Sequence, residues 1–429
     1  MSDYTNTQEY LYSLRNRGAK LGLERMVSFN EALGQPDRQF PIIHVAGTNG
    51  KGSVCAMLES IYRHAGLKTG MFTSPHLIRL GERVQVNRVP LTDAEIVHWV
   101  NHLKPFAESL ANGDDEAHPT FFEFMTAMAF LQFARQAVDV AIVETGLGGR
   151  LDSTNVITPR VSVITSVSYD HQDLLGDTLS KIAREKAGII KPGVPVVLGR
   201  LPNEAEIAIR AIAAERSCTV TSIAERFGDR VEDYPNVALA GDHQRINAAT
   251  AWLAVEQAGL EVLPMQIREG LRQVSWAGRW QHMALVDGRT MILEAAHNEE
   301  GARALEANLK KLVLDSSRKP IVVCGTLGQQ RADELMPIVA RYASAIYLLV
   351  PEQPRACSFA ELRAALPADH GLEVRNASVS ELFPGPGRCS VGGPEDTILV
   401  TGSIYMLGEI LARLEQDTGA ESIHLQDKI

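Results

Sequence analysis

A glycine-rich loop between a buried strand and an amphipathic helix constrains the fold of this 429-residue chain more than any other feature. The apolar run over residues 41–45 predicts a buried strand, and it leads directly into Ala46-Gly47-Thr48-Asn49-Gly50-Lys51-Gly52-Ser53. Apolar residues then recur at helical spacing over residues 54–65. Strand, glycine loop and helix in this order are typical of a phosphate-binding loop in a parallel α/β domain.

The residue types of this loop suit polyphosphate binding. Glycines allow backbone N–H groups to face phosphate oxygens, and the helix that follows directs the positive end of its dipole at them. Lys51 can reach the outer phosphates, and Ser53 offers a hydroxyl to a magnesium ion. The loop departs from G-x-x-x-x-G-K-[ST] because it is shorter at the front and carries Gly52 between the lysine and the serine. We expect a variant phosphate loop that binds ATP rather than an ordinary glycine turn.

Strand and helix patterns alternate through the first part of the chain. A capping box, Thr92 with Glu95, opens one helix, and aromatic and methionine residues recur at helical spacing over residues 120–136. Between such segments we predict strands over residues 68–73, 139–144, 161–167 and 194–198. The alternation predicts an α/β domain with a mainly parallel sheet.

A second series of strands and helices follows, with strands predicted over residues 290–295, 320–326, 345–350 and 397–401. The chain is also longer than one hydrophobic core usually covers. We therefore predict two domains, with a boundary near Val286. A P-loop ATPase domain occupies residues 1–286, and a smaller Rossmann-like α/β domain occupies residues 287–429.

Composition and charge exclude several classes of protein. A formal net charge of −10 would repel a phosphate backbone, so we expect no nucleic-acid partner. The chain has no apolar run long enough to cross a bilayer, and residues 1–15 lack the features of a signal peptide, so we expect a cytoplasmic protein without a membrane partner. The 5 cysteines are far apart and odd in number, which favours reduced packing residues over disulfides or a metal site.

Polar residues at two strand ends predict a metal site. Glu144 ends one predicted strand, and Asp170 and His171 follow the next one. The carboxyl ends of parallel strands form the edge where α/β proteins bind their ligands. Hard oxygen ligands suit magnesium, so we expect this edge to hold the ion.

The glycine loop resembles the G-T-N-G-K-G-[ST] loop of the Mur ligase superfamily, and other motifs narrow the resemblance to folylpolyglutamate and dihydrofolate synthases. These motifs cover most of the chain: Thr73-Ser74-Pro75-His76-Leu77, Glu82-Arg83-Val84, Glu144-Thr145-Gly146-Leu147-Gly148-Gly149-Arg150-Leu151-Asp152, Asp170-His171, Glu185-Lys186-Ala187-Gly188-Ile189, His243-Gln244 with Asn247, Gly278-Arg279 and Ala296-His297-Asn298. The family is implied by the order and spacing of the whole set.

The resemblance implies roles for the residues that match these motifs. Two magnesium ions would be held by Ser53, Ser74, Glu144, His171 and a carbamylated Lys186. The nucleotide would be bound by Gly47, Thr48, Asn49, Gly50, Lys51, Gly52, Ser53, Asn247, Arg279 and Glu294. The catalytic set would be Lys51, His171, Lys186 and His297. Taken singly, Ser74, Glu144 and His171 also have structural interpretations as a turn residue, a helix cap and a surface histidine, and Lys186 as a solvated lysine.

Two further segments correspond by resemblance to the pterin-binding residues of the family. They are Thr120-Phe121-Phe122-Glu123 and Leu151-Asp152-Ser153. Aromatic rings stack on a pterin, and carboxylates accept hydrogen bonds from its amino groups. For Phe121 and Phe122, packing of a helix start into the core is an equal alternative.

The chain departs from the family pattern in the second domain. Glu294 stands where the family usually has Asp, and Glu299 stands where it usually has Pro. The family's D-K-D run is replaced by Gln329-Gln330-Arg331-Ala332-Asp333. The contacts to glutamate are therefore the part of the site that the resemblance defines least.

The resemblance implies an ATP-dependent amide ligase, working as a monomer, that adds L-glutamate to dihydropteroate, to reduced folates or to both. The γ-phosphoryl group of ATP would activate the carboxylate as an acyl phosphate, which the amine of glutamate attacks while the second domain closes over the first. One rival is a Mur-type ligase acting on a cell-wall precursor. Another is a nucleotide-binding module without turnover, against which Glu144, His171 and Lys186 together favour chemistry.

Overall fold

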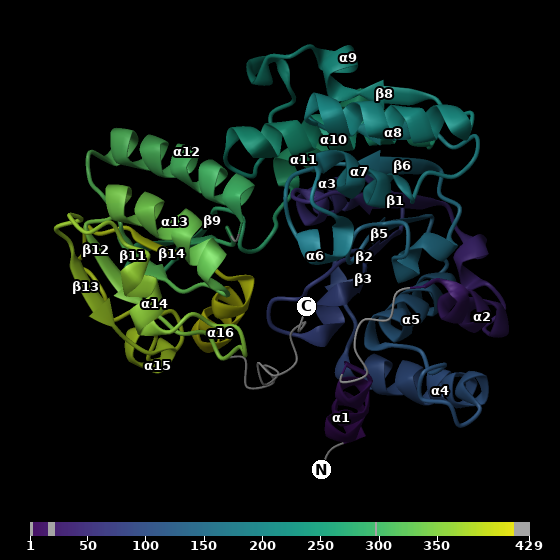
Figure 1. Ribbon diagram of the computed structural model, residues 1–429, viewed down its shortest axis with the longest axis horizontal. Coiled ribbons are helices and arrows are strands. Elements are labelled where there is room, and N and C mark those ends of the chain that lie inside the picture. Colours follow the sequence, from purple (N-terminus) through teal and green to yellow (C-terminus); the bar gives the residue numbers. More distant parts are fainter. Residues whose placement is uncertain (1–2, 16–21, 297, 416–429) are drawn as a thin grey trace.

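The computed structural model describes residues 3–15, 22–296 and 298–415, which form two α/β lobes that lie side by side (Figure 1). Each lobe is built on one sheet flanked by helices. Both sheets are mainly parallel, which confirms the predicted α/β class. Among the described residues, no helix has the length and apolar character needed to cross a membrane.

The first sheet has the strand order β4-β3-β2-β5-β1-β6-β7-β8. The strands from β2 to β8 in this order pair in parallel, and β3 and β4 form an antiparallel hairpin at one edge. Their bounds are β1 Ile42–Ala46, β2 Thr69–Phe72, β3 Val84–Val86, β4 Val89–Pro90, β5 Val140–Glu144, β6 Val161–Ile164, β7 Val196–Leu198 and β8 Val220–Ser222.

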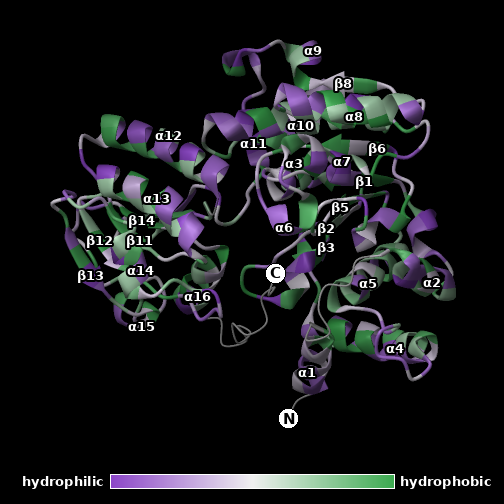
Figure 2. Cartoon of the chain, viewed as in Figure 1, coloured by the Kyte–Doolittle hydropathy of each residue, from purple (hydrophilic) through white to green (hydrophobic). Residues whose placement is uncertain are grey.

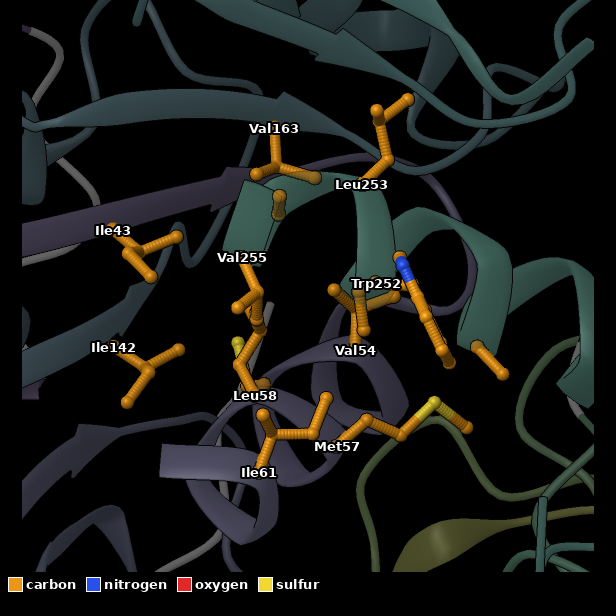
Figure 3. Packing of buried hydrophobic residues seen from close by; sticks show 14 of the residues in the cluster. Ile43, Val54, Met57, Leu58, Ile61, Ile142, Val163, Trp252, Leu253 and Val255 are labelled. Atoms are coloured by element: carbon orange, nitrogen blue, oxygen red, sulfur yellow. The ribbon is translucent and has the colours of Figure 1, made fainter. Parts of the chain in front are cut away.

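Helices cover both faces of this sheet. Successive residues of β1 point to opposite faces of the sheet. Ile43 packs with the helices α3, α10 and α11, and Ile42 packs with α2, α4 and α5 on the other face. Figure 3 shows the first cluster, where Val54 and Leu58 face Val255. The helix bounds are α1 Asp3–Arg15, α2 Glu24–Ala32, α3 Lys51–His64, α4 Asp93–Ala111, α5 Phe121–Arg135, α6 Gln172–Leu175, α7 Leu179–Ala187, α8 Asn203–Glu215, α9 Ile223–Phe227, α10 Asp242–Ala258 and α11 Pro264–Gln273, with 3-10 turns η1 Pro36–Gln39, η2 Leu80–Arg83, η3 Ser153–Val156 and η4 Val231–Asp233.

The second sheet has the order β13-β12-β11-β14-β10-β9, in which only β9 runs antiparallel to its neighbour. Hydrophilic and hydrophobic residues alternate along the helices of this lobe, as Figure 2 shows for α12 and α13. The hydrophobic side of each helix can therefore pack in the core. The bounds are β9 Gln281–Ala284, β10 Thr290–Glu294, β11 Ile321–Cys324, β12 Ala345–Leu348, β13 Glu373–Asn376, β14 Ile398–Thr401, α12 Glu299–Ser316, α13 Gln329–Tyr342, α14 Phe359–Ala364, α15 Val379–Leu382 and α16 Ile404–Leu414.

The segment between the two sheets runs from the end of α11 to the start of β9. Strand β9 pairs with β10, so the second sheet already begins at Gln281. We therefore propose that the domain junction lies within residues 274–280, here called the linker, a few residues before the boundary expected near Val286. All five cysteines are free, and four of them are buried as packing residues.

Candidate active site

A cavity of about 490 Å³ lies where the carboxyl ends of the first sheet face the second lobe. The first lobe contributes the glycine loop, the ends of β2, β5 and β6, and the start of α5. The second lobe contributes residues that follow β10, β11 and β14. The cavity therefore joins strand ends of two parallel sheets, the position at which α/β proteins bind ligands.

The glycine loop forms one wall of this cavity. Helix α3 begins at Lys51, and Gly50 before it has φ +83°, a conformation that glycine adopts without strain. A Cβ atom on Gly50 would lie 2.4 Å from Oδ1 of Asn247, so the loop packs directly on α10. Nζ of Lys51 donates to the carbonyl oxygens of Gly47 and Thr48 at 3.0 and 3.1 Å, which places the ammonium group over the loop.

Ser53 and Ser74 bring hydroxyl groups to the same wall. Ser53 lies in the first turn of α3, is buried, and accepts a hydrogen bond from Nε2 of Gln244 at 3.3 Å. Ser74 follows β2, and its backbone N–H donates to Oε2 of Glu144 at 3.1 Å. The carboxylate of Glu144 thus lies between the ends of β2 and β5.

Glu144 is buried at the end of β5, as the sequence predicted. Burial raises the pKa of this carboxyl group to about 7, and the charges of Lys51 and Arg279 oppose the rise. A carboxylate that is costly to ionise in the empty protein is a suitable ligand for a cation, because the cation removes that cost.

Lys186 and His171 approach the cavity from α7 and α6. Lys186 is only 3% exposed. Burial lowers the pKa of its amine to about 7, and the charge of Lys51 adds to the effect. His171 precedes α6 with φ +49°, and burial lowers its pKa while Asp170, with Oδ1 at 3.7 Å from Nε2, opposes the change.

The side chains at the cavity suit a magnesium ion, which takes part of its coordination from water and phosphate, rather than a metal ion coordinated by protein side chains alone. Within the described ranges, no group of three or more His, Cys, Asp or Glu side chains is arranged to hold a metal ion. The cavity instead brings together the two hydroxyls and the carboxylate of Ser53, Ser74 and Glu144. Magnesium commonly binds in this way, because it keeps several waters and takes one or two carboxylates together with substrate phosphates.

The residues predicted to contact the nucleotide also line the cavity. Asn247 lies on α10, beside the glycine loop. Arg279 comes from the linker, and its Nη1 donates to the carbonyl of Ala295 at 3.3 Å. Glu294 ends β10 and accepts a hydrogen bond from the N–H of Trp280 at 2.8 Å. Burial raises the pKa of Glu294 to about 7, with Arg279 opposing.

The predicted pterin residues divide into two groups. Thr120, Phe121, Phe122 and Asp152 line the cavity, whereas Glu123, Leu151 and Ser153 do not. Glu123 instead closes the capping box of α5 with Thr120 and accepts from Nε of Arg25 at 3.3 Å. Ser153 shares a hydrogen bond of 2.8 Å with Thr126. His297, the remaining predicted catalytic residue, lies outside the described residues.

Comparison with known proteins identifies the family. The family model for the Mur ligase middle domain matches residues 45–255, and that for the Mur ligase glutamate ligase domain matches residues 278–404. The dihydrofolate synthase/folylpolyglutamate synthase of Bacillus subtilis is 36% identical, with 96% of this chain and 99% of the relative covered. This chain belongs to the folylpolyglutamate synthase/dihydrofolate synthase family.

Solved structures of family members agree in fold. The Escherichia coli protein FolC in complex with DHPP and ADP has a TM-score of 0.82 at 30% identity, covering 96% of this chain and 97% of that chain. A bifunctional folylpolyglutamate synthase/dihydrofolate synthase with Mn, AMPPNP and L-glutamate bound has a TM-score of 0.79 at 31% identity, covering 95% and 98%. The predicted Mur-ligase-like fold is confirmed, and the synthase interpretation is favoured over a cell-wall ligase or a non-catalytic module.

The family motifs did not single out every residue at this synthase cavity. Glu300, Arg331, Arg355 and Tyr405 line it from the second lobe. Arg331 lies in the first turn of α13, after β11, so its place behind a predicted strand was a usable signal. Arg355 and Tyr405 carry the same signal, because they follow the strands predicted over residues 345–350 and 397–401.

Proposed function

We propose that this chain joins L-glutamate to the carboxylate of dihydropteroate, of reduced folates or of both, with ATP converted to ADP and phosphate. The observation that carries the proposal is a single cavity that holds a phosphate loop, buried oxygen donors and an aromatic wall, closed by a second lobe. The relatives named for these activities match nearly the whole chain. The acidic net charge gives no support to a nucleic-acid partner.

The proposed nucleotide site consists of the glycine loop, residues 47–53, with Asn247, Arg279 and Glu294. For the divalent metal we propose Ser53, Ser74, Glu144, His171 and Lys186 around two magnesium ions, which would neutralise charge on the transferring phosphoryl group. The solved relative with Mn and AMPPNP supports the use of a nucleotide with a divalent ion. Lys51 and, by family resemblance, His297 would add positive charge that helps to neutralise the phosphoryl group.

We propose that Lys186 is carbamylated. A buried amine with a pKa of about 7 is about half neutral at that pH and mostly neutral above it, and only the neutral amine attacks carbon dioxide. Its nitrogen forms a bond to the carbon and loses one proton, which leaves a negatively charged carbamate. When the protein is incubated with bicarbonate labelled with carbon-13, its NMR spectrum should show a carbamate signal that is absent from the spectrum of Lys186→Ala. The same spectrum for both proteins would contradict the proposal.

The pteridine would lie against Thr120, Phe121, Phe122 and Asp152. Oδ2 of Asp152 accepts from the N–H of Leu147 at 2.9 Å, so this carboxylate also holds the wall of the cavity in place. Glu123, Leu151 and Ser153, also proposed as substrate-binding residues, lie behind this wall rather than in the lining of the cavity. Since both lobes of one chain complete the cavity, we propose that the enzyme works as a monomer.

The chemistry that follows is a two-step acyl transfer. A carboxylate oxygen of the pteroyl substrate attacks the γ-phosphorus of ATP and ADP leaves, which gives an acyl phosphate. The amine of glutamate then attacks the carbonyl carbon, loses a proton, and displaces phosphate. The cavity contributes position and charge, with Lys51 over the phosphate loop and the second lobe excluding water.

The experiment that tests this function follows the oxygen atoms. Dihydropteroate or tetrahydrofolate with heavy oxygen in its carboxylate is incubated with ATP, magnesium and L-glutamate. Mass spectrometry should find one heavy oxygen in the released phosphate and a product larger by one glutamyl residue. A glutamylated product with only light phosphate would exclude the acyl phosphate, and no product from either pteridine would exclude the function.

A further inference from the structure

The turn between β3 and β4 holds an arginine where a glycine would fit the backbone better. Asn87 and Arg88 both have positive φ, +49° and +67°, as in the type I′ turns that favour Asn-Gly. A residue with a Cβ atom is strained in this conformation, whereas glycine is not. The turn itself gives no reason for an arginine, so the reason must lie in what its side chain contacts.

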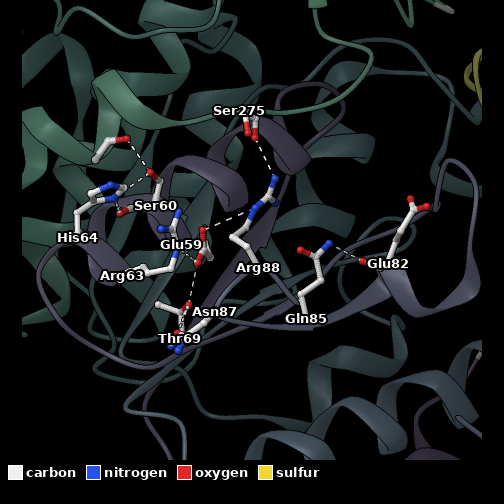
Figure 4. A network of polar contacts seen from close by, with 11 residues as sticks. Glu59, Ser60, Arg63, His64, Thr69, Glu82, Gln85, Asn87, Arg88 and Ser275 are labelled. Atoms are coloured by element: carbon white, nitrogen blue, oxygen red, sulfur yellow. Dashed lines mark hydrogen bonds and ion pairs between the residues drawn. The ribbon is translucent and has the colours of Figure 1, made fainter. Parts of the chain in front are cut away.

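The side chain of Arg88 contacts the linker (Figure 4). Nη2 donates to the carbonyl oxygen of Ser275 at 3.0 Å. The guanidinium carbon lies 5.1 Å from the ring centroid of Trp276, within the range of a cation–π interaction. Through these two contacts the hairpin at the edge of the first sheet holds the segment that leads to the second sheet.

The same guanidinium group is held by α3, the helix that follows the phosphate loop. Nε of Arg88 is 3.9 Å from Oε2 of Glu59, whose side chain is 1% exposed. Oε1 of Glu59 accepts from Thr69 and Arg63 at 2.9 and 2.8 Å, so the carboxylate is fixed with its second oxygen directed at Arg88. A buried carboxylate held in this way gives the arginine a defined position.

The linker reaches the phosphate loop through Trp276, which Arg88 contacts, and the cavity through Arg279. A Cβ atom on Gly52 would lie 3.1 Å from Nε1 of Trp276, so the indole ring packs against the phosphate loop. Arg279, three residues further along, lines the cavity and acts electrostatically on Glu144 and Glu294. A shift of the linker would therefore move Trp276 relative to the phosphate loop and the guanidinium group of Arg279 relative to the cavity.

We propose that Arg88 is a positioning residue that clamps the linker, holding Trp276 against the phosphate loop and Arg279 at the cavity. Nucleotide in the loop and the placement of the second lobe are coupled through this clamp. The effect on turnover rests on the proposed ligase function, whereas the contact between Trp276 and the loop can be tested by nucleotide binding alone.

The test uses Arg88→Gly, because glycine suits the turn and removes only the side chain. We expect little change in Tm, because relief of the strained turn offsets the lost ion pair with Glu59. We expect a roughly tenfold lower kcat and an unchanged KM for the pteridine, whose proposed residues lie at the start of α5 and after β5 rather than in the linker. Arg88→Lys keeps the positive charge but loses the planar guanidinium group, so its kcat should lie between those of the wild type and Arg88→Gly. Asn112→Gly makes the same change at another positive-φ position, at the exposed end of α4, and should match the wild type.

A spectroscopic arm separates the clamp from a merely structural role. ATP should change the tryptophan fluorescence of the wild type, and Trp276→Phe should remove that change. In Arg88→Gly the change should also be lost while calorimetry still detects ATP binding. A wild-type response and wild-type kcat in Arg88→Gly would overturn the clamp, and so would a loss of activity that follows a fall in Tm. If the wild type shows no pteridine-dependent turnover, the ligase function fails while the fluorescence arm still decides on the clamp.

Discussion

At the residue scale, Glu144 and Lys186 give the cavity its unusual electrostatics. Burial raises the pKa of the carboxyl group and lowers the pKa of the amine, each to about 7. Both groups are therefore only partly ionised near pH 7, although each is fully charged in water. Such groups are expected where a ligand supplies the charge that ionises them.

The raised pKa of Glu144 predicts a gain in stability when the charge is removed. In the unfolded chain the group ionises near its ordinary pKa, so the folded protein loses stability as pH rises from about 4.5 to about 7 and the loss is complete above that. Glu144→Gln should raise the free energy of unfolding by about 3 kcal/mol at pH ~9, and by much less at pH ~5. The measurement is denaturant unfolding without nucleotide or metal.

The exposed Glu108 on α4 supplies the control for this experiment. Glu108→Gln should leave the free energy of unfolding within about 0.5 kcal/mol at both pH values. Glu144→Gln should also abolish turnover, because the proposed magnesium ligand is gone. A variant as active as the wild type, or one with no pH-dependent gain, would contradict the role given to Glu144.

Sequence predicted the residues of the site that belong to contiguous motifs. Lys51, Ser74, Glu144 and Lys186 meet in one cavity because each lies at a strand end or in a helix that the patterns located. Glu123, predicted to contact the substrate, does not line the cavity in this structure, where a local capping box directs its carboxylate back toward the start of α5. Short-range hydrogen bonds of that kind decide side-chain direction, and a motif does not reveal them.

At the scale of elements, the glycine loop depends on backbone that only glycine supplies. Gly50→Ala puts a methyl group 2.4 Å from Oδ1 of Asn247, in a conformation already unfavourable for alanine. We expect ATP affinity to fall by about tenfold or more, because the strained loop must rearrange and the amide of Asn247 must move away from it. Isothermal titration with ATP and magnesium measures the change.

Gly193 provides a matched control for this loop variant. It also has positive φ, +72°, but a Cβ atom there would have no heavy atom within 4 Å. Gly193→Ala should cost roughly 1 kcal/mol of stability and leave ATP affinity unchanged. Equal losses of ATP affinity in the two variants would show that the loop has no special packing requirement.

Sequence patterns located the buried strands and missed several of the more exposed ones. The strands β1, β5 and β10 were predicted within two residues, since each is a buried apolar run. The hairpin β3–β4 was not predicted, because Gln85 interrupts the apolar residues of β3 and the two residues of β4 are exposed. Strand β9 is partly exposed, and apolar and polar residues do not alternate clearly along it. The sequence pattern therefore could not locate the start of the second sheet.

At the scale of the whole molecule, the two lobes meet through polar contacts beside the phosphate loop. Asn298 donates to Oδ1 of Asn49 at 3.0 Å, and Glu300 accepts hydrogen bonds from Asn49 and from Oγ of Ser168 at 2.9 Å. Partly or fully exposed hydrogen bonds of this kind contribute little each, so they suit an interface that opens and closes. The way the lobes face each other had no signal in the sequence.

Removing Glu300 should loosen this interface. Glu300→Ala loses two hydrogen bonds from the first lobe, and we expect KM for glutamate to rise about fivefold. X-ray scattering of the nucleotide-free variant should show a larger radius of gyration. Glu299→Ala, which removes the neighbouring carboxylate paired with Arg303 within α12, should change neither quantity. Identical behaviour of the two variants would contradict a role for Glu300 in closure.

Phosphate release by the purified protein tests the central claim most directly. The protein is given ATP, magnesium and L-glutamate, with dihydropteroate, with tetrahydrofolate, and with neither. A ligase of this family should release phosphate only when a pteridine is present, and the relative rates rank the two substrates. ATP binding without stimulation by either pteridine would contradict the folate assignment and direct the search to other carboxylates.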